Sequence, residues 1–151
     1  MKPSSVHRIP CLLAACLLLA SGAAAQPKLT QRDKSQIIRL ILRTYNFGKS
    51  ATRDGDTVYL LNENISHADI PSRPGVTFEI VNQAQIDRLK PTGIEYYRLN
   101  EFDIHGTSVR TYFVREYMSS LESNSSAIEY TCRKVRGRWK LRARLGGVGA
   151  T

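Results

Sequence analysis

The segment from Ser126 to Leu145, SAIEYTCRKVRGRWKLRARL, constrains the fold most, because apolar and polar residues alternate along it. Two alternating runs flank Arg136-Gly137, and a glycine at the second turn position permits the positive φ of a tight hairpin. Counting outward predicts an apolar face pairing Lys134 with Trp139, Cys132 with Leu141, Tyr130 with Ala143 and Ile128 with Leu145. The polar face would pair Arg133 with Lys140, Thr131 with Arg142 and Glu129 with Arg144. A shift of one residue would set apolar side chains against charged ones, so the alternation predicts the register.

The predicted hairpin also carries the net charge. Residues 26–132 hold 13 basic and 13 acidic side chains, whereas residues 133–144 add seven Lys or Arg and no acidic residue. The chain beyond residue 25 therefore has a formal net charge of +7. One interpretation is a solvated strand surface that resists aggregation. The other is a docking surface for a polyanion, with the candidate anion-binding residues Arg133, Arg138, Lys140, Arg142 and Arg144.

Residues 1–25 are typical of a secretory signal peptide. A basic start precedes the apolar stretch Ile9–Ala20, which is too short to span a bilayer, and small residues then offer an Ala-x-Ala cleavage site before Gln26. We therefore predict export to the periplasm or the extracellular space. The lipobox-like Leu13-Ala14-Ala15-Cys16 leaves a lipoprotein anchored through Cys16 as the less favoured alternative, because the apolar run before it is short.

Residues 26–145 are expected to form a single domain, with a flexible glycine-containing tail at residues 146–151. A chain of this length can bury a core without disulfide bonds. Cys132 is the one cysteine beyond the predicted signal peptide, so the exported form would have no intrachain disulfide. Because the alternation places Cys132 on the apolar face, we expect a buried, unreactive thiol.

The middle of the chain predicts a helix followed by strands. Thr30 and Asp33 have the spacing of a capping box, and a broad apolar arc follows until Asn46 and Gly48 supply a stop. Strands are predicted at 58–61, 76–81, 94–104 and 108–118, with a short helical turn at 84–89. The fold class is therefore α+β, with one N-terminal helix packed on a curved, mainly antiparallel sheet of five to six strands.

The strands at 94–104 and 108–118 are expected to form a hairpin around His105-Gly106. Counting outward from this turn pairs Phe102 with Val109 and Leu99 with Tyr112. The apolar face switches between these two pairs, which indicates either a bulge or a sheet covered in part on both faces.

Few residues indicate catalysis. His67 and His105 are the only histidines beyond residue 25, and Ser66, His67 and Asp69 lie too close in sequence for a hydrolytic triad. The sequence contains no Gly-rich phosphate loop, no CxxC pair and no HExxH motif. We therefore expect no cofactor, no metal site and no catalytic residue.

The chain passes from one long helix to mostly antiparallel strands and closes on Lys134-Val135-Arg136-Gly137-Arg138-Trp139-Lys140. This layout resembles cystatin-like and nuclear-transport-factor-like α+β domains, and it looks like small uncharacterised secreted bacterial proteins with a similar arrangement. The resemblance implies the α+β layout and no particular activity, because such domains include enzymes, binders and interaction modules. No catalytic residue can be transferred from it.

The sequence favours an exported, non-catalytic binding module whose basic hairpin docks on an anionic polymer or on a membrane or envelope surface. The alternative is a small pocket-bearing enzyme or ligand carrier of cystatin-like fold. No nucleic-acid motif is present, and no aromatic residue interleaves with the basic ones on the polar face, which argues against stacking on single-stranded bases. The oligomeric state is left open.

Overall fold

The computed structural model describes residues 28–47 and 57–150. Its elements in chain order are α1 (Gln31–Thr44), β1 (Thr57–Leu61), η2 (His67–Asp69), β2 (Thr77–Val81), α2 (Gln83–Leu89), η3 (Lys90–Thr92), β3 (Ile94–Leu99), β4 (Asp103–His105), β5 (Ser108–Met118), β6 (Ser123–Val135) and β7 (Arg138–Ala150). The predicted signal peptide, its cleavage site and the predicted helix stop at Gly48 lie outside the described residues.

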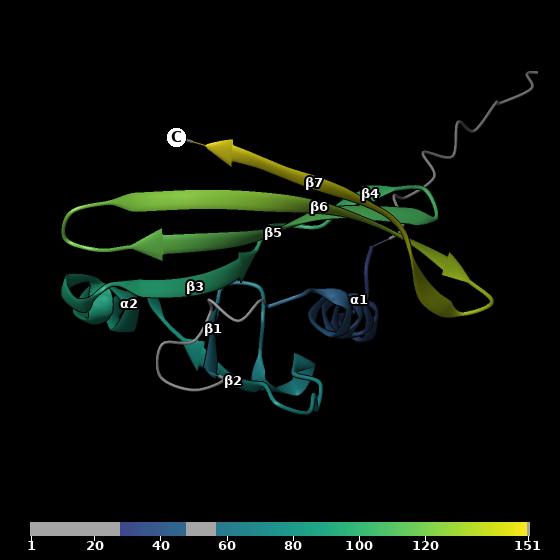
Figure 1. Ribbon diagram of the computed structural model, residues 1–151. Helices are drawn as coiled ribbons and strands as arrows, with labels where there is room; N and C mark the ends of the chain where they lie inside the picture. The colour runs from purple at the N-terminus through teal and green to yellow at the C-terminus, as the bar shows by residue number, and fades with distance from the viewer. Residues whose placement is uncertain (1–27, 48–56, 151) are drawn as a thin grey trace, which may run out of the picture.

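The fold is α+β, with one mixed sheet that curls around α1 (Figure 1). Within the described residues the sheet has seven strands in the order β2-β1-β3-β5-β6-β7, and β4 pairs with β5 off this path. β1 is parallel to both β2 and β3, and the remaining pairs are antiparallel. The prediction of a mainly antiparallel sheet with five to six strands and one helix therefore needs correction. The chain leaves β2 through α2 and crosses β1 to reach β3, and a helical crossover of this kind joins parallel strands.

Helix α1 begins where the capping box predicts. The Thr30 side chain accepts a hydrogen bond from the Asp33 backbone N–H at 3.1 Å, and Asp33 accepts one from Thr30 in return. The apolar arc of α1 then lies against the concave face of the sheet, with Ile37 and Leu42 fully buried. The facing strands contribute buried side chains from several positions, among them Leu60, Leu99, Val109, Phe113, Tyr130 and Cys132.

Helix α2 covers the opposite face of the sheet around β1 and β3. Side chains alternate between faces along a strand, so Leu60 packs in the α1 core while Leu61 joins a second cluster. That cluster holds Leu61, Val81, Ile86, Ile94 and Tyr96. On β5, β6 and β7 the face away from α1, called the outer face below, has no described helix over it (Figure 1).

The β4–β5 hairpin differs from the predicted pairing. Ile104 pairs with Val109, whereas Leu99 pairs with Phe113, so the register changes by one residue between β3 and β4. The predicted pair of Phe102 with Val109 is wrong, but the expected irregularity is present and interrupts the strand at residues 100–102.

The β6–β7 hairpin has the predicted turn. Arg136 and Gly137 both have positive φ, 50° and 76°, as in the mirror-image turns that match strand twist. The four pairs nearest the turn follow the predicted register, from Val135 with Arg138 to Cys132 with Leu141. β7 continues to Ala150, so the domain boundary predicted at Leu145 falls inside this strand.

Candidate functional site

The tip of the β6–β7 hairpin bends down beside the start of α1 (Figure 1). There the Lys134 ammonium and the Trp139 indole N–H both donate to Asp33 Oδ1, at 2.7 and 2.9 Å. The hydrogen bonds from Lys134 and Trp139 hold the pKa of Asp33 well below its ordinary value of 3.8. Lys134 is thus engaged in holding the fold, and the basic residues around it are left to face solvent.

A bulge in β7 redirects two of the predicted anion-binding residues. Beyond Leu141 the register shifts, so that Thr131 pairs with Ala143 and Tyr130 with Arg144. Arg142 is therefore the extra residue of the bulge, and Arg144 moves to the face of the sheet that carries α1. The alternation in the sequence gives no sign of this change.

Arg144 stacks over aromatic rings on the α1 side. Its guanidinium carbon lies 5.7 Å from the centre of the Tyr45 ring and 6.0 Å from that of Tyr130. Both distances are in the range of cation–π attraction. The prediction that Arg144 shares one face with Arg138 and Lys140 is therefore wrong.

Three basic side chains remain together on the outer face. Arg133 pairs directly with Lys140 across the hairpin, and Arg138 lies two residues from Lys140 on the same face of β7. All three are exposed, and within residues 28–47 and 57–150 none forms an ion pair. We call Arg133, Arg138 and Lys140 the basic triplet.

Two acidic residues on the same part of the sheet, Glu129 and Asp103, make other contacts. Glu129 pairs with Leu145 and accepts a hydrogen bond from the Tyr112 hydroxyl at 2.7 Å. The carboxylate of Asp103 accepts from Arg110 at 2.7 Å and lies 2.8 Å from His105 Nε2, and these contacts lower its pKa. Neither carboxylate forms an ion pair with the basic triplet within the described residues.

A second feature lies where β3 is interrupted before β4. A hollow of about 660 Å³ opens there, lined by Glu63, Asn64, Arg98, Leu99, Asn100, Glu101 and Tyr112. We call it the polar hollow. Sequence reasoning missed it, because its residues come from the segment after β1, from β3 and its end, and from β5, with no recognisable spacing.

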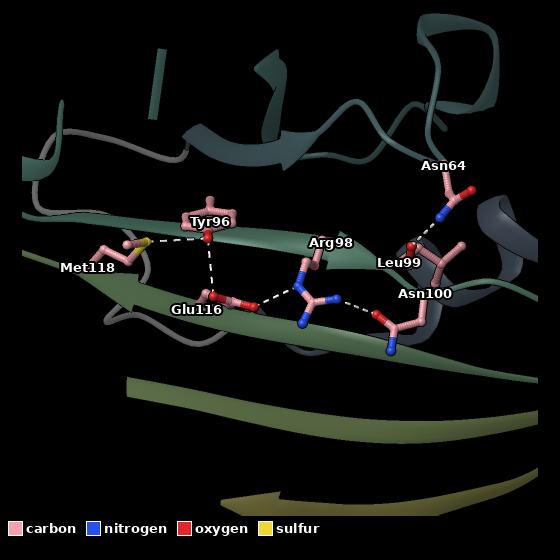
Figure 2. A network of polar contacts seen from close by, with 7 residues as sticks. All are labelled: Asn64, Tyr96, Arg98, Leu99, Asn100, Glu116 and Met118. Atoms are coloured by element: carbon pink, nitrogen blue, oxygen red, sulfur yellow. Dashed lines mark hydrogen bonds and ion pairs between the residues drawn. The ribbon is translucent and has the colours of Figure 1, made fainter. Parts of the chain in front are cut away.

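Hydrogen bonds hold several side chains of the polar hollow in place (Figure 2). Arg98 Nε donates to Glu116 at 2.6 Å, and Arg98 Nη1 donates to Asn100 Oδ1. Asn64 Nδ2 donates to the Leu99 carbonyl oxygen at 2.8 Å. The wall between β3 and β5 is therefore fixed before any ligand binds.

Tyr96 belongs to the same network. Its hydroxyl donates to Glu116 at 3.1 Å, and the Met118 sulfur lies 3.4 Å away (Figure 2). Burial and the neighbouring Glu116 carboxylate raise the pKa of Tyr96 to about 12. Tyr96 therefore remains neutral and keeps Glu116 oriented toward Arg98.

The structure describes the surroundings of His105, of the turn that contains His67 and of Cys132. His105 and Asp103 make contact, but their side chains are 59% and 52% exposed on a hairpin rather than gathered in a cleft. Asp69 is buried and accepts hydrogen bonds from Ser66 and Ser35, which closes the turn around His67. Cys132 is fully buried, and burial raises the pKa of its thiol to about 11, as expected for an unreactive thiol.

Within the described part of the chain, no group of three or more His, Cys, Asp or Glu side chains is placed to hold a metal ion. No helix among those residues has the length and hydropathy needed to cross a membrane. Comparisons with protein-family models, curated proteins and solved structures found no match to this chain.

Proposed function

We propose that the protein is an exported, non-catalytic binding module that docks on an anionic polymer or surface through the basic triplet. The observation that carries the proposal is the grouping of Arg133, Arg138 and Lys140 on one exposed strand face without a carboxylate partner among the described residues. Like charges held on neighbouring positions repel, and an external anion relieves that repulsion.

Because the three side chains lie on one face of the sheet, they can contact several anionic groups of a polymer or surface at once. The side chains lie on two adjacent strands, about 5 Å apart across the pair and about 7 Å apart along β7. Two of the three are Arg, whose guanidinium can contact a phosphate, sulfate or carboxylate group with two hydrogen bonds. The space between α1 and the sheet is packed by apolar side chains of the core, so the triplet on the outer face is the feature that favours docking over the enzyme alternative.

The competing explanation is protection of a sheet edge. β7 ends the strand order, and basic side chains on an edge strand discourage pairing with other chains. This role needs positive charge but no ligand. The two explanations therefore differ in whether the protein binds polyanions and in which face binds them.

Retention on heparin and on anionic liposomes across a salt series tests the proposal. The wild type should be retained at low salt. A plot of the logarithm of affinity against the logarithm of salt concentration should have a slope that corresponds to about three released counter-ions. The triple variant Arg133→Gln, Arg138→Gln and Lys140→Gln should lose retention. The charge-matched control Arg32→Gln, Arg43→Gln and Arg88→Gln removes three exposed charges on the helices and should keep it.

The single variant Arg144→Gln provides a second control. Because Arg144 lies on the α1 side, its replacement should leave heparin retention close to that of the wild type. Failure of the wild type to bind at low salt would leave edge protection as the role of the charges. Equal losses in both triple variants would show that net charge, and not the triplet, determines binding.

A further inference from the structure

The polar hollow has the size of a small-ligand site. Its volume of about 660 Å³ falls within the roughly 300–1,000 Å³ of typical ligand pockets. Its lining combines two amides, two carboxylates, one guanidinium and one tyrosine ring. The site lies at the end of β3 and is distinct from the basic triplet on β6 and β7.

The hydrogen bonds already present determine which atoms remain for a ligand. Asn64 uses its amide N–H₂ on Leu99, which leaves its carbonyl oxygen as an acceptor. Asn100 uses its carbonyl oxygen on Arg98, which leaves its N–H₂ as a donor. Glu63 and Glu101 are exposed and form no ion pair within the described residues, so they add further acceptors.

The charged side chains of the described lining disfavour an anionic ligand. Arg98 forms an ion pair with Glu116 at 2.6 Å, while Glu63 and Glu101 form no ion pair within the described residues. This lining therefore favours a neutral or positively charged ligand that carries O–H or N–H donors. This preference is opposite to that of the basic triplet.

Tyr112 adds a flat apolar surface at the rim. Its hydroxyl donates to Glu129 at 2.7 Å, and the residue is still 37% exposed. A ligand in the hollow would therefore contact the ring of Tyr112 and not its hydroxyl. A ring that carries hydroxyls at its edge and C–H groups on its face matches an aromatic platform surrounded by acceptors. From this combination we infer that the polar hollow binds a neutral or amino sugar ring of a glycan.

The test is an NMR titration of the folded protein. The side-chain amide signals of Asn64 and Asn100 report directly on the polar hollow. Cellotetraose, a glucosamine tetramer and a galacturonate tetramer are added up to about 20 mM, because open polar sites bind weakly. The first two should shift both amide signals, with the glucosamine tetramer binding tighter at low salt, and the anionic sugar should leave them unchanged.

Two substitutions separate ring stacking from hydrogen bonding. Tyr112→Ala should weaken cellotetraose binding at least about tenfold, while Tyr112→Phe keeps the ring and should retain binding. Asn100→Asp keeps the acceptor for Arg98 but removes the N–H₂ donor, so it should weaken cellotetraose binding several-fold. Asn124→Asp, an exposed position on β6, serves as its matched control.

Three outcomes would overturn the inference. The first is the absence of shifts at Asn64 and Asn100 with both cellotetraose and the glucosamine tetramer. The second is unchanged binding by Tyr112→Ala. The third is a pattern in which the glucosamine tetramer and a tetralysine peptide shift the same amide signals while cellotetraose has no effect. That pattern would indicate that the hollow attracts any cation and does not recognise a sugar ring.

Discussion

Asp33 joins the first and the last elements of the fold, so its replacement should affect stability more than that of any exposed acid. It accepts hydrogen bonds from Lys134 and Trp139 while its own helix uses it in the capping box with Thr30. Asp33→Ala removes every contact of the carboxylate and leaves only the hydrogen bond from the backbone N–H of residue 33 to Thr30, whereas Asp33→Asn keeps the shape but removes the charge. Both variants leave the apolar core of α1 untouched.

The expected loss follows from the number and kind of contacts. A hydrogen bond to a charged group contributes about 1.5–3 kcal/mol, and loss of a helix cap costs about 0.5–2 kcal/mol. Because Lys134 is 41% exposed, solvent screens its part of the contribution. We therefore expect Asp33→Ala to lower the free energy of unfolding by about 2–4 kcal/mol, a large share of the usual 5–15 kcal/mol.

The effect of Asp33→Asn should depend on pH. The pKa of Asp33 is lower in the folded state, so the unfolded chain binds its proton more readily and stability rises with pH through this range. The stabilisation is fully present above the ordinary value of 3.8 and is lost as pH falls below it. The difference in the free energy of unfolding between the wild type and Asp33→Asn should therefore be constant from about pH 5 to 8 and should shrink toward pH 2.

Urea unfolding followed by tryptophan fluorescence measures this directly, because Trp139 is the one tryptophan of the chain. Asp87→Ala is the matched control, since Asp87 is exposed on α2 and should change stability by less than about 0.5 kcal/mol. A loss below about 0.5 kcal/mol for Asp33→Ala at pH 7 would refute the reasoning. The reasoning would also fail if the free energies of unfolding of the wild type and Asp33→Asn differed by the same amount at pH 7 and at pH 3.

Three further predictions concern the core, one turn and the start of the chain. Cys132→Ser should lower stability by about 1–3 kcal/mol and keep any binding activity, and the native thiol should react with iodoacetamide far more slowly than the unfolded one. Gly93→Ala would place a methyl carbon 2.8 Å from the Tyr117 hydroxyl, so in urea unfolding it should cost about 1–3 kcal/mol, more than Gly75→Ala, which has similar φ and open space. Mass spectrometry of the secreted protein should find Gln26 at its N-terminus, and an uncleaved or lipid-modified chain would contradict the signal-peptide prediction.

Local signals in the sequence were sufficient for several elements. The spacing of Thr30 and Asp33 predicts the helix start, and Arg136-Gly137 predicts the turn, because each depends on residues only a few positions apart. The alternation around Cys132 predicts its burial for the same reason. The α+β class follows from the order of these elements.

Features that depend on tertiary structure were not predictable in this way. The parallel pairing of β1 with β2 and β3 is set by the path of the crossover, which strand patterns do not encode. The bulge at Arg142 increases the local bend where β7 follows the curl of the sheet around α1, yet the alternation runs through it unbroken. The polar hollow depends on the contact between Asn64 and Leu99. These two residues are 35 positions apart in the sequence, so no local pattern indicates that they meet.

The bonds between Asp33 and the final hairpin span 101 and 106 positions of sequence. Closing so long a loop reduces the entropy of the chain, and only the contacts formed afterwards offset this loss. The start of α1 therefore reaches its final environment only when the last two strands are in place. A chain that ends before Lys134 lacks both donors to Asp33, and one that ends before Arg138 lacks all of β7. The α1 core includes Tyr130 and Cys132 of β6 and is packed by Trp139 and Leu141 of β7, so it is complete only after these last two strands have been synthesised. Chains clipped before β7 should therefore leave part of the apolar face of α1 uncovered and open to proteases and to aggregation.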